Sequence, residues 1–182
     1  MKNRTTPYSI TELNNMVKVY QGLQGKRVHK FRLKPHTDAE KKSTKTDSWD
    51  LPLTVCSCAL KIKPFIADNG RNCSALKIPH RVLADAYDNI VDNSGKKIGS
   101  IPLGSKPNGT IKALLHLKGR DSFNAGRCAE PHAANSVLNQ IKKGSSSTIA
   151  IPDLLFSIAL DARYQVAKEY CVTCRCVFPQ LR

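Results

Sequence analysis

The sequence predicts an α/β fold, because segments with the spacing of helices alternate with segments of strand length. Apolar residues recur at helical spacing over residues 78–93, and residues 129–142 have the pattern of a second helix. Residues 153–160 form a nearly continuous apolar run, which is typical of a central strand covered on both faces. At 182 residues, the chain can support one ordinary core.

The first 75 residues are basic and are predicted to contain one helix and a possible strand. Apolar side chains follow helical spacing over residues 11–23. Residues 36–50 are polar and charged, as in a loop or linker, and residues 51–66 alternate in the manner of a strand. We expect this region, residues 1–75, to complete the core of the remainder.

A helix, a hairpin, a helix and a strand are predicted in that order after residue 76. The first helix covers residues 78–93, and two strands follow over residues 98–103 and 110–117, joined by a loop rich in turn-forming residues. The second helix covers residues 129–142 and the strand residues 153–160. Residues 162–169 are predicted to be a loop or a short helix.

Two cysteine motifs carry the chemistry of the chain. They are Cys128-Ala129-Glu130 and Cys171-Val172-Thr173-Cys174. Three thiolates leave one coordination position of a zinc ion for water, whereas a structural zinc site is normally closed by four protein ligands. The alternative is a set of buried cysteines with a disulfide or a redox CxxC pair. Because seven cysteines are an odd number, they cannot all pair within one chain, and metal binding is the simpler interpretation.

The spacing of the first motif separates a ligand from an acid. A helix that starts near Cys128 places the thiolate in its first turn, where the helix dipole favours an anion. Pro131 agrees with this placement, because proline is tolerated in a first turn. Glu130 then lies about 200° around the helix axis from Cys128. We therefore expect its carboxylate to reach a zinc-bound water rather than the zinc.

The other cysteines and histidines have plainer interpretations. His132 lies four residues after Cys128, on the same helix face, and is expected to line the core or the pocket rather than bind metal. Cys176 is expected to be a core thiol. The remaining three cysteines are expected to pack as small apolar groups, with a second metal site that includes His80 as the alternative. These three are Cys56, Cys58 and Cys73.

The segments GRCAEPHAANSVL (126–138) and YCVTCRC (170–176) resemble the zinc-dependent cytidine deaminase superfamily. In a small basic chain, the CAEP form is most similar to the deaminase domains of bacterial polymorphic toxins. The resemblance implies Zn2+ as cofactor, with Cys128, Cys171 and Cys174 as its ligands and Glu130 as the general acid and base. Tyr170 stands where the family usually has proline.

The resemblance also implies a fold. That fold is a three-layer sandwich, in which helices flank a central mixed β-sheet. The family order is a helix, a strand hairpin, the CAE helix, a strand and the CxxC helix, followed by further strands and helices. We assign residues 76–182 to this deaminase-like domain. Since residues 175–182 alone follow the second motif, we expect a sheet that is shortened there or completed by the N-terminal region or a partner.

The implied reaction is hydrolytic deamination of a nucleobase, with conversion of cytosine to uracil in single-stranded nucleic acid as the default. A formal net charge of +15 indicates an acidic partner, which is nucleic acid, an anionic membrane or an acidic protein. In the resembling family, an asparagine before the motif holds the sugar, which points to Asn124. Arg127 is placed to meet a phosphate. His132 and Tyr170 are further candidates for substrate binding.

The same features leave other functions open. One alternative is a non-catalytic, zinc-supported nucleic-acid-binding module. Another is a cysteine-dependent hydrolase or protein deamidase that uses Cys128 with a histidine. The chain contains no stretch long enough to span a bilayer, so we expect no membrane partner and a cytoplasmic site of action, reached by delivery if the chain is a toxin or effector. An acidic inhibitor or immunity protein is an expected partner, and an oligomer is compatible with the sequence.

Overall fold

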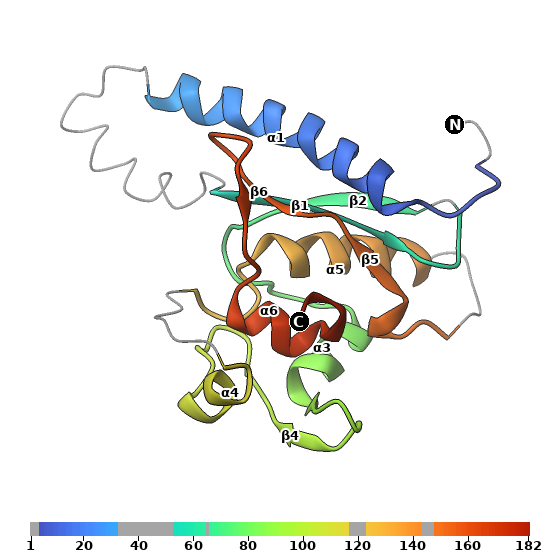
Figure 1. Ribbon diagram of the computed structural model, residues 1–182, viewed down its shortest axis with the longest axis vertical. Coiled ribbons are helices and arrows are strands. Elements are labelled where there is room, and N and C mark those ends of the chain that lie inside the picture. Colours follow the sequence, from blue (N-terminus) through green and yellow to red (C-terminus); the bar gives the residue numbers. More distant parts are fainter. Residues whose placement is uncertain (1–3, 33–52, 65, 117–122, 143–147) are drawn as a thin grey trace.

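A computed structural model describes residues 4–32, 53–64, 66–116, 123–142 and 148–182. The loop expected over residues 36–50 lies outside these ranges. Figure 1 shows a central sheet with the long helix α1 (Ile10–Arg32) along one face and α5 (Ala129–Lys142) along the other. Among the described residues, no helix combines the length and the apolar character needed to cross a membrane.

The central sheet is built around a strand from the N-terminal region. Its five strands are β1 (Thr54–Leu60), β2 (Ala67–Arg71), β5 (Leu154–Phe156), β6 (Ala159–Asp161) and β7 (Ala167–Lys168). Strand β1 pairs with β2 along one edge and with β5 and β6 along the other, and β7 extends the sheet beyond β6. The first 75 residues therefore supply the centre of the sheet.

All strand pairs in the described residues are antiparallel, so the expected mixed sheet is wrong for this part of the chain. A parallel pair needs a crossover connection, usually through a helix. The connection from β2 through α5 to β5 is such a crossover, but β1 lies between those two strands. After the helix α6 (Val172–Val177), the chain forms the short 3-10 helix η3 (Pro179–Leu181) instead of another strand.

Strand β1 forms where the sequence predicts it, because its small and apolar side chains can be covered on both faces. Val55 packs with Val17 of α1 and with Leu160. On the other face, Cys56 and Cys58 are fully buried in the larger core that includes α5. Alternate residues of β1 thus face different helices, as the period of two along a strand requires.

Helix α1 is confirmed and is longer than the predicted residues 11–23. Two of its amide side chains fix it to the edge of the sheet. The Ile158 N–H donates to Asn14 Oδ1 at 2.9 Å, and Gln21 Nε2 donates to the Ala162 carbonyl at 3.0 Å. Because both bonds join α1 to backbone after β5, this helix covers the β1 and β6 face of the sheet.

The single strand predicted over residues 153–160 is divided into β5 and β6 at Ser157. Ser157 N–H donates to the Ser57 carbonyl at 2.9 Å, while the Ser57 N–H donates to Ser157 Oγ at 2.8 Å. A side-chain oxygen therefore replaces a carbonyl in the ladder, which lets both halves remain paired with β1. The short 3-10 helix η2 (Ile151–Asp153) leads into this strand pair.

The helix predicted over residues 78–93 is shorter than expected. It is observed as α3 (Arg81–Asp88), and the imidazole Nδ1 of His80 accepts from the Val82 N–H at 3.2 Å as an N-cap. After Asn89 the chain becomes strand β3 (Ile90–Val91), which pairs with β4 (Lys97–Gly99). The apolar pattern thus continues past the end of the helix into a strand.

The hairpin predicted from residues 98–103 and 110–117 is wrong. Residues in the second of these segments form helix α4 (Gly109–Leu114). Asn108 is the reason, since its Oδ1 accepts from the Ile111 N–H at 3.0 Å and caps the helix. In the described residues, two antiparallel strand pairs precede α5: β1–β2 in the central sheet and β3–β4 in a separate two-stranded sheet.

Strand β2 and helix α5 approach each other at a glycine. A Cβ at Gly70 would overlap the Ala129 carbonyl oxygen and the Ala133 nitrogen, both of which are backbone atoms. Backbone cannot rotate away as a side chain can, so only glycine permits this distance. The start of α5, and with it the first cysteine motif, is therefore placed by contact with β2.

We predict that Gly70→Ala will destabilise the protein by about 1–3 kcal/mol, the usual cost of overpacking, because α5 must move off the sheet. Gly22→Ala is the matched control: its Cβ would meet no atom within 4 Å, and alanine favours a helix interior. Chemical denaturation of the two variants measures the difference. Equal free energies of unfolding for both would contradict the proposed close contact.

Candidate metal centre and adjoining cavity

Cys128 is held at the start of α5 by a turn that glycine permits. Gly126 has a φ of 81°, a left-handed conformation that other residues rarely adopt. Two backbone bonds then fasten this turn to the segment after β2: Cys73 N–H donates to the Arg127 carbonyl at 3.1 Å, and Leu76 N–H donates to the Gly126 carbonyl at 3.1 Å. Cys128 follows directly and is 8% exposed.

The CxxC motif presents its two sulfurs from the beginning of α6. Cys171 is the N-cap residue, and its Sγ accepts from the Cys174 N–H at 3.4 Å. This is a position in which unpaired helical N–H groups favour a thiolate. Cys174 lies in the first turn of the helix and is fully buried.

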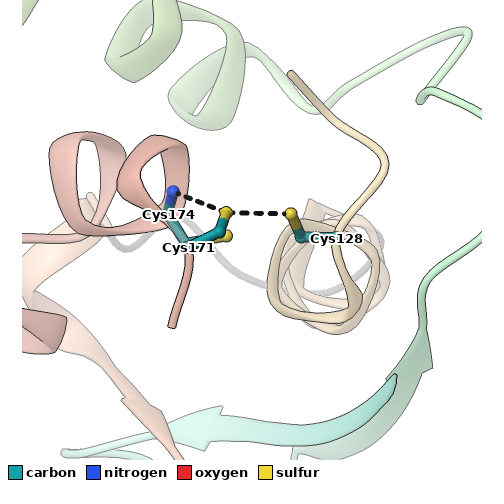
Figure 2. A group of neighbouring side chains, drawn as sticks. All are labelled: Cys128, Cys171 and Cys174. Carbon is teal, nitrogen blue, oxygen red and sulfur yellow. Dashed lines mark hydrogen bonds between the residues drawn. The ribbon is translucent and has the colours of Figure 1, made fainter. Parts of the chain in front are cut away.

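The three cysteines meet although they come from distant parts of the chain. Cys128 Sγ lies 3.0 Å from Cys171 Sγ, and the sulfurs of all three residues lie within 4.8 Å of one another. Figure 2 shows the side chains of the two helix starts pointing toward each other. Among the described residues, this is the one group of three or more potential ligands that could hold a metal ion.

The cluster concentrates negative charge on one sulfur. Hydrogen bonds from Cys128 and then Cys174 lower the pKa of Cys171 well below that of an ordinary thiol. The bond to Cys171 raises the pKa of Cys128, and burial raises the pKa of Cys174. Cys128 and Cys174 would release their thiol protons when a metal binds.

The donor set fits a tetrahedral thiolate site. Ligand sulfurs of a zinc ion, at about 2.3 Å from the metal, lie about 3.8 Å from one another, a separation these three sulfurs can reach with small side-chain shifts. The buried Tyr87 hydroxyl has no hydrogen-bond partner in the described structure. Burial, and then the charges of Cys174 and Cys128, raise the pKa of Tyr87, so its hydroxyl is within electrostatic reach of the cluster. The Tyr87 hydroxyl could donate a hydrogen bond to a sulfur of the cluster once metal binding has removed the thiol protons.

Glu130 adjoins the cluster without belonging to it. Its carboxylate is 3% exposed, and its Oε2 accepts from the Cys174 thiol at 3.2 Å. Burial, and then the negative charge of Cys171, raise the pKa of Glu130 to about 7. A carboxyl group with this pKa can both accept and donate a proton near neutrality.

A cavity of about 160 Å³ opens beside the sulfurs and the carboxyl group. Its walls come from four parts of the chain: the β1–β2 hairpin, the loop before α5, the first residues of α5, and the segment from β7 to α6. The lining residues are Thr54, Asn72, Phe123, Cys128, Ala129, Glu130, Lys168, Glu169 and Cys171. A small molecule in this cavity would contact two of the three cysteines, Cys128 and Cys171, and also Glu130.

Asn72 is one of several lining residues that the sequence did not identify. Its Oδ1 accepts from the backbone N–H groups of Leu53 and Thr54, each at 2.7 Å, and the residue is 6% exposed. Because Oδ1 is occupied, the amide Nδ2 is the group that the side chain can offer to the cavity. An asparagine directly after a hairpin strand was the available signal, but the hairpin had been predicted elsewhere.

Two of the predicted substrate contacts lie near the site but outside the cavity lining. The Asn124 carbonyl accepts from the Arg127 N–H at 3.2 Å, as part of the turn before α5. Arg127 Nε donates to the Cys73 carbonyl at 3.3 Å, which turns its guanidinium toward the segment after β2. Asn124 and Arg127 thus shape the loop that carries Cys128.

The other two predicted contacts have protein partners. His132 Nε2 lies 3.0 Å from the Ser74 carbonyl, and its ring packs beside Cys73 rather than the three-cysteine cluster. Its separation from the cluster arises because Cys128 precedes α5, so the spacing of four residues does not place both on one helix face. Tyr170 donates from its hydroxyl to the Ser157 carbonyl at 2.8 Å. Neither residue lines the cavity.

The remaining cysteines mostly behave as expected. Cys56, Cys58 and Cys176 are buried, and burial raises the pKa of each. Cys176 is outside the three-sulfur group, and His80 serves as a helix cap rather than as part of a second metal site. Cys73 differs from the expectation, because it is partly exposed and packs against His132 instead of the apolar core.

We predict that the purified protein binds one equivalent of a thiophilic metal and that Cys128→Ser or Cys174→Ser reduces the bound metal severely. Loss of one of the three protein ligands removes a negative charge and leaves one coordination position without its sulfur. Cys176→Ala, two residues from Cys174, is the control and should retain the metal. Elemental analysis after dialysis gives the ratio, and full metal content in the two ligand variants would exclude this centre.

Comparison with known proteins gives no assignment: no family model matches the chain, and neither a curated protein nor a solved structure matches it.

Proposed function

We propose that this protein is a zinc-dependent deaminase that converts cytosine to uracil in single-stranded nucleic acid. The observation that carries the proposal is the convergence of three cysteine sulfurs with a buried carboxyl group beside a small cavity. A metal centre with three protein ligands and an adjacent acid has the parts that hydrolysis at an amidine carbon requires. The resemblance of the two cysteine motifs supplies the reaction class.

The order of elements supports a deaminase-like fold. The family order of helix, hairpin, CAE helix, strand and CxxC helix has counterparts in α1, the β1–β2 hairpin, α5, the divided strand β5–β6, and α6. The segment between β2 and α5, which contains α3, β3, β4 and α4, is then an insertion in that order. With this alignment the N-terminal region belongs to the fold instead of preceding it.

Each group in the site has a defined role in the proposed reaction. Zinc held by the three sulfurs would lower the pKa of water toward neutrality. Glu130 accepts a proton from water and returns it to the pyrimidine ring nitrogen, and its buried carboxyl group lies beside the sulfurs where both steps take place. Water adds at the carbon that bears the amino group, and ammonia leaves, so that cytosine and water give uracil and ammonia.

The cavity walls can position the base and its sugar. Asn72 offers an amide donor whose orientation is fixed by Leu53 and Thr54. Phe123 provides an apolar surface on which a base can stack. Because the reacting carbon of a paired base is inside the helical stack, the proposed substrate is single-stranded or has its base flipped out.

The charge of the chain favours a polymeric substrate. A formal net charge of +15 attracts phosphate backbones, and such binding weakens steeply as the salt concentration rises. The resemblance extends the proposal to a toxin or effector, for which an acidic inhibitor would be a complementary partner.

We predict that Glu130→Gln lowers the deamination rate by about 10²–10⁴-fold while metal binding is retained, because the amide cannot transfer protons. Uracil formation is measured on single-stranded DNA, single-stranded RNA and free cytidine, with wild-type and variant protein in parallel. Glu169→Gln is the matched control, since this carboxylate also lines the cavity but is exposed and pairs with Arg175.

The outcomes separate the candidate functions. Metal binding and nucleic-acid binding by wild-type protein, without uracil on any substrate, would refute the enzymatic proposal in favour of a binding module. Activity that survives metal removal but not alkylation of Cys128 would indicate a cysteine-dependent enzyme.

We further predict that Asn72→Asp raises KM about tenfold, the effect of losing roughly 1.4 kcal/mol of ground-state binding. Aspartate keeps an oxygen for the Leu53 and Thr54 N–H groups but replaces the amide donor. Asn124→Asp, outside the cavity lining, should leave KM close to the wild-type value. A larger increase in KM for Asn124→Asp than for Asn72→Asp would indicate that Asn124, and not Asn72, contacts the sugar.

A further inference from the structure

A second cluster of reactive side chains lies apart from the three-cysteine centre. Cys73 follows Asn72 just after β2, and His132 is in the first part of α5. Cys73 Sγ lies 3.3 Å from His132 Nε2 and 3.6 Å from Nδ1. Neither residue belongs to the potential metal-ligand group or to the cavity lining.

The imidazole of this pair is suited to accept a proton. Burial lowers the pKa of His132, and the positive charge of Arg71 lowers it further, which favours the neutral ring that a proton acceptor requires. Hydrogen bonds to the Ser74 and Gly126 carbonyls act in the opposite direction and would stabilise the imidazolium once a proton arrives. A thiol beside a basic ring and a positive charge has an increased thiolate fraction.

The backbone holds the pair in position. Cys73 N–H donates to the Arg127 carbonyl at 3.1 Å, and Arg127 Nε donates back to the Cys73 carbonyl at 3.3 Å. His132 Nε2 lies 3.0 Å from the Ser74 carbonyl and donates to it in the neutral ring, so Nδ1, 3.6 Å from the sulfur, is the nitrogen that can accept the thiol proton. The Cys73 sulfur and the His132 imidazole are therefore already in contact before any ligand binds.

Cys73 and Cys171 are the two partly exposed cysteines, and Cys171 belongs to the three-sulfur group. Cys56, Cys58 and Cys176 are buried with raised pKa values, and the three sulfurs of the metal centre are directed at one another. Cys73 is partly exposed and has a nitrogen base in contact. Solvent access together with a base is the environment of a reactive thiol rather than a structural one.

We propose that Cys73 and His132 form a second, nucleophilic site that reacts with soft electrophiles, hydroperoxides among them. His132 takes the thiol proton, and the Cys73 sulfur attacks one peroxide oxygen as the O–O bond breaks. The sulfur loses two electrons and becomes a sulfenic acid, while the other oxygen takes the proton from His132 and leaves as water or an alcohol. This inference is independent of the proposed deaminase activity.

The test is the order in which the seven cysteines react in the full-length, metal-loaded protein. Limiting iodoacetamide, and in parallel dilute hydrogen peroxide followed by a sulfenic-acid trap, are analysed by peptide mapping. We expect Cys73 to be modified first by both reagents. His132→Gln should slow alkylation at Cys73 about tenfold or more, because the base is lost. His29→Gln, an exposed histidine of α1, is the control and should leave the rate unchanged.

Each result bears on the proposal separately. First modification at another cysteine in wild-type protein overturns it, and this readout needs no variant to fold. An unchanged Cys73 rate in a His132→Gln protein with a wild-type circular dichroism spectrum overturns the role of the imidazole. Because labels on Cys128 and Cys171 are read from other peptides, failure of the metal centre is distinguishable from failure of this site.

Discussion

The contact between the sulfurs of Cys128 and Cys171 is the constraint on which the rest of the candidate site depends. It joins the starts of two helices, α5 and α6, which are connected by the strands β5 to β7. Thiols brought to 3.0 Å must share protons, and the N-terminal N–H groups of α6 favour the anion on Cys171. The position of Glu130, its raised pKa and the adjoining cavity all follow from the way these two helix starts meet.

The sheet makes this meeting possible by fixing α5 first. Gly70 brings β2 against the backbone of α5, and strand β1 is buried on both faces between α1 and α5. The segment between β2 and α5 is fastened at its two ends by the backbone hydrogen bonds of Cys73 and Leu76. The same bonds place Asn72 on the cavity wall and Cys73 beside His132. These two hydrogen bonds thus position residues of both the candidate catalytic site and the Cys73–His132 pair.

Several elements were predictable because their signals are local. Helix α5, strand β1 and the helix at the N-terminus follow from periodicity, and the CxxC pair lies at a helix start as expected. Helix α4 (Gly109–Leu114) lies where a strand was predicted over residues 110–117, since a single cap from Asn108 outweighs an ambiguous apolar pattern. The break at Ser157 depends on a hydrogen bond with Ser57, a hundred residues earlier, and no local pattern records it.

The sequence by itself determined which groups can do chemistry, because thiolate ligands and an acid are recognisable from residue type and spacing in Cys128, Glu130 and the CxxC motif. Tertiary structure decided which groups share a site. Asn72 joins the cavity and Asn124 does not, because β1 and β2, rather than residues 98–117, form the hairpin beside α5. His132 faces Cys73 for the same reason. Strand pairing is a long-range choice, whose energy comes from burying both faces of β1 and cannot be read from any one segment.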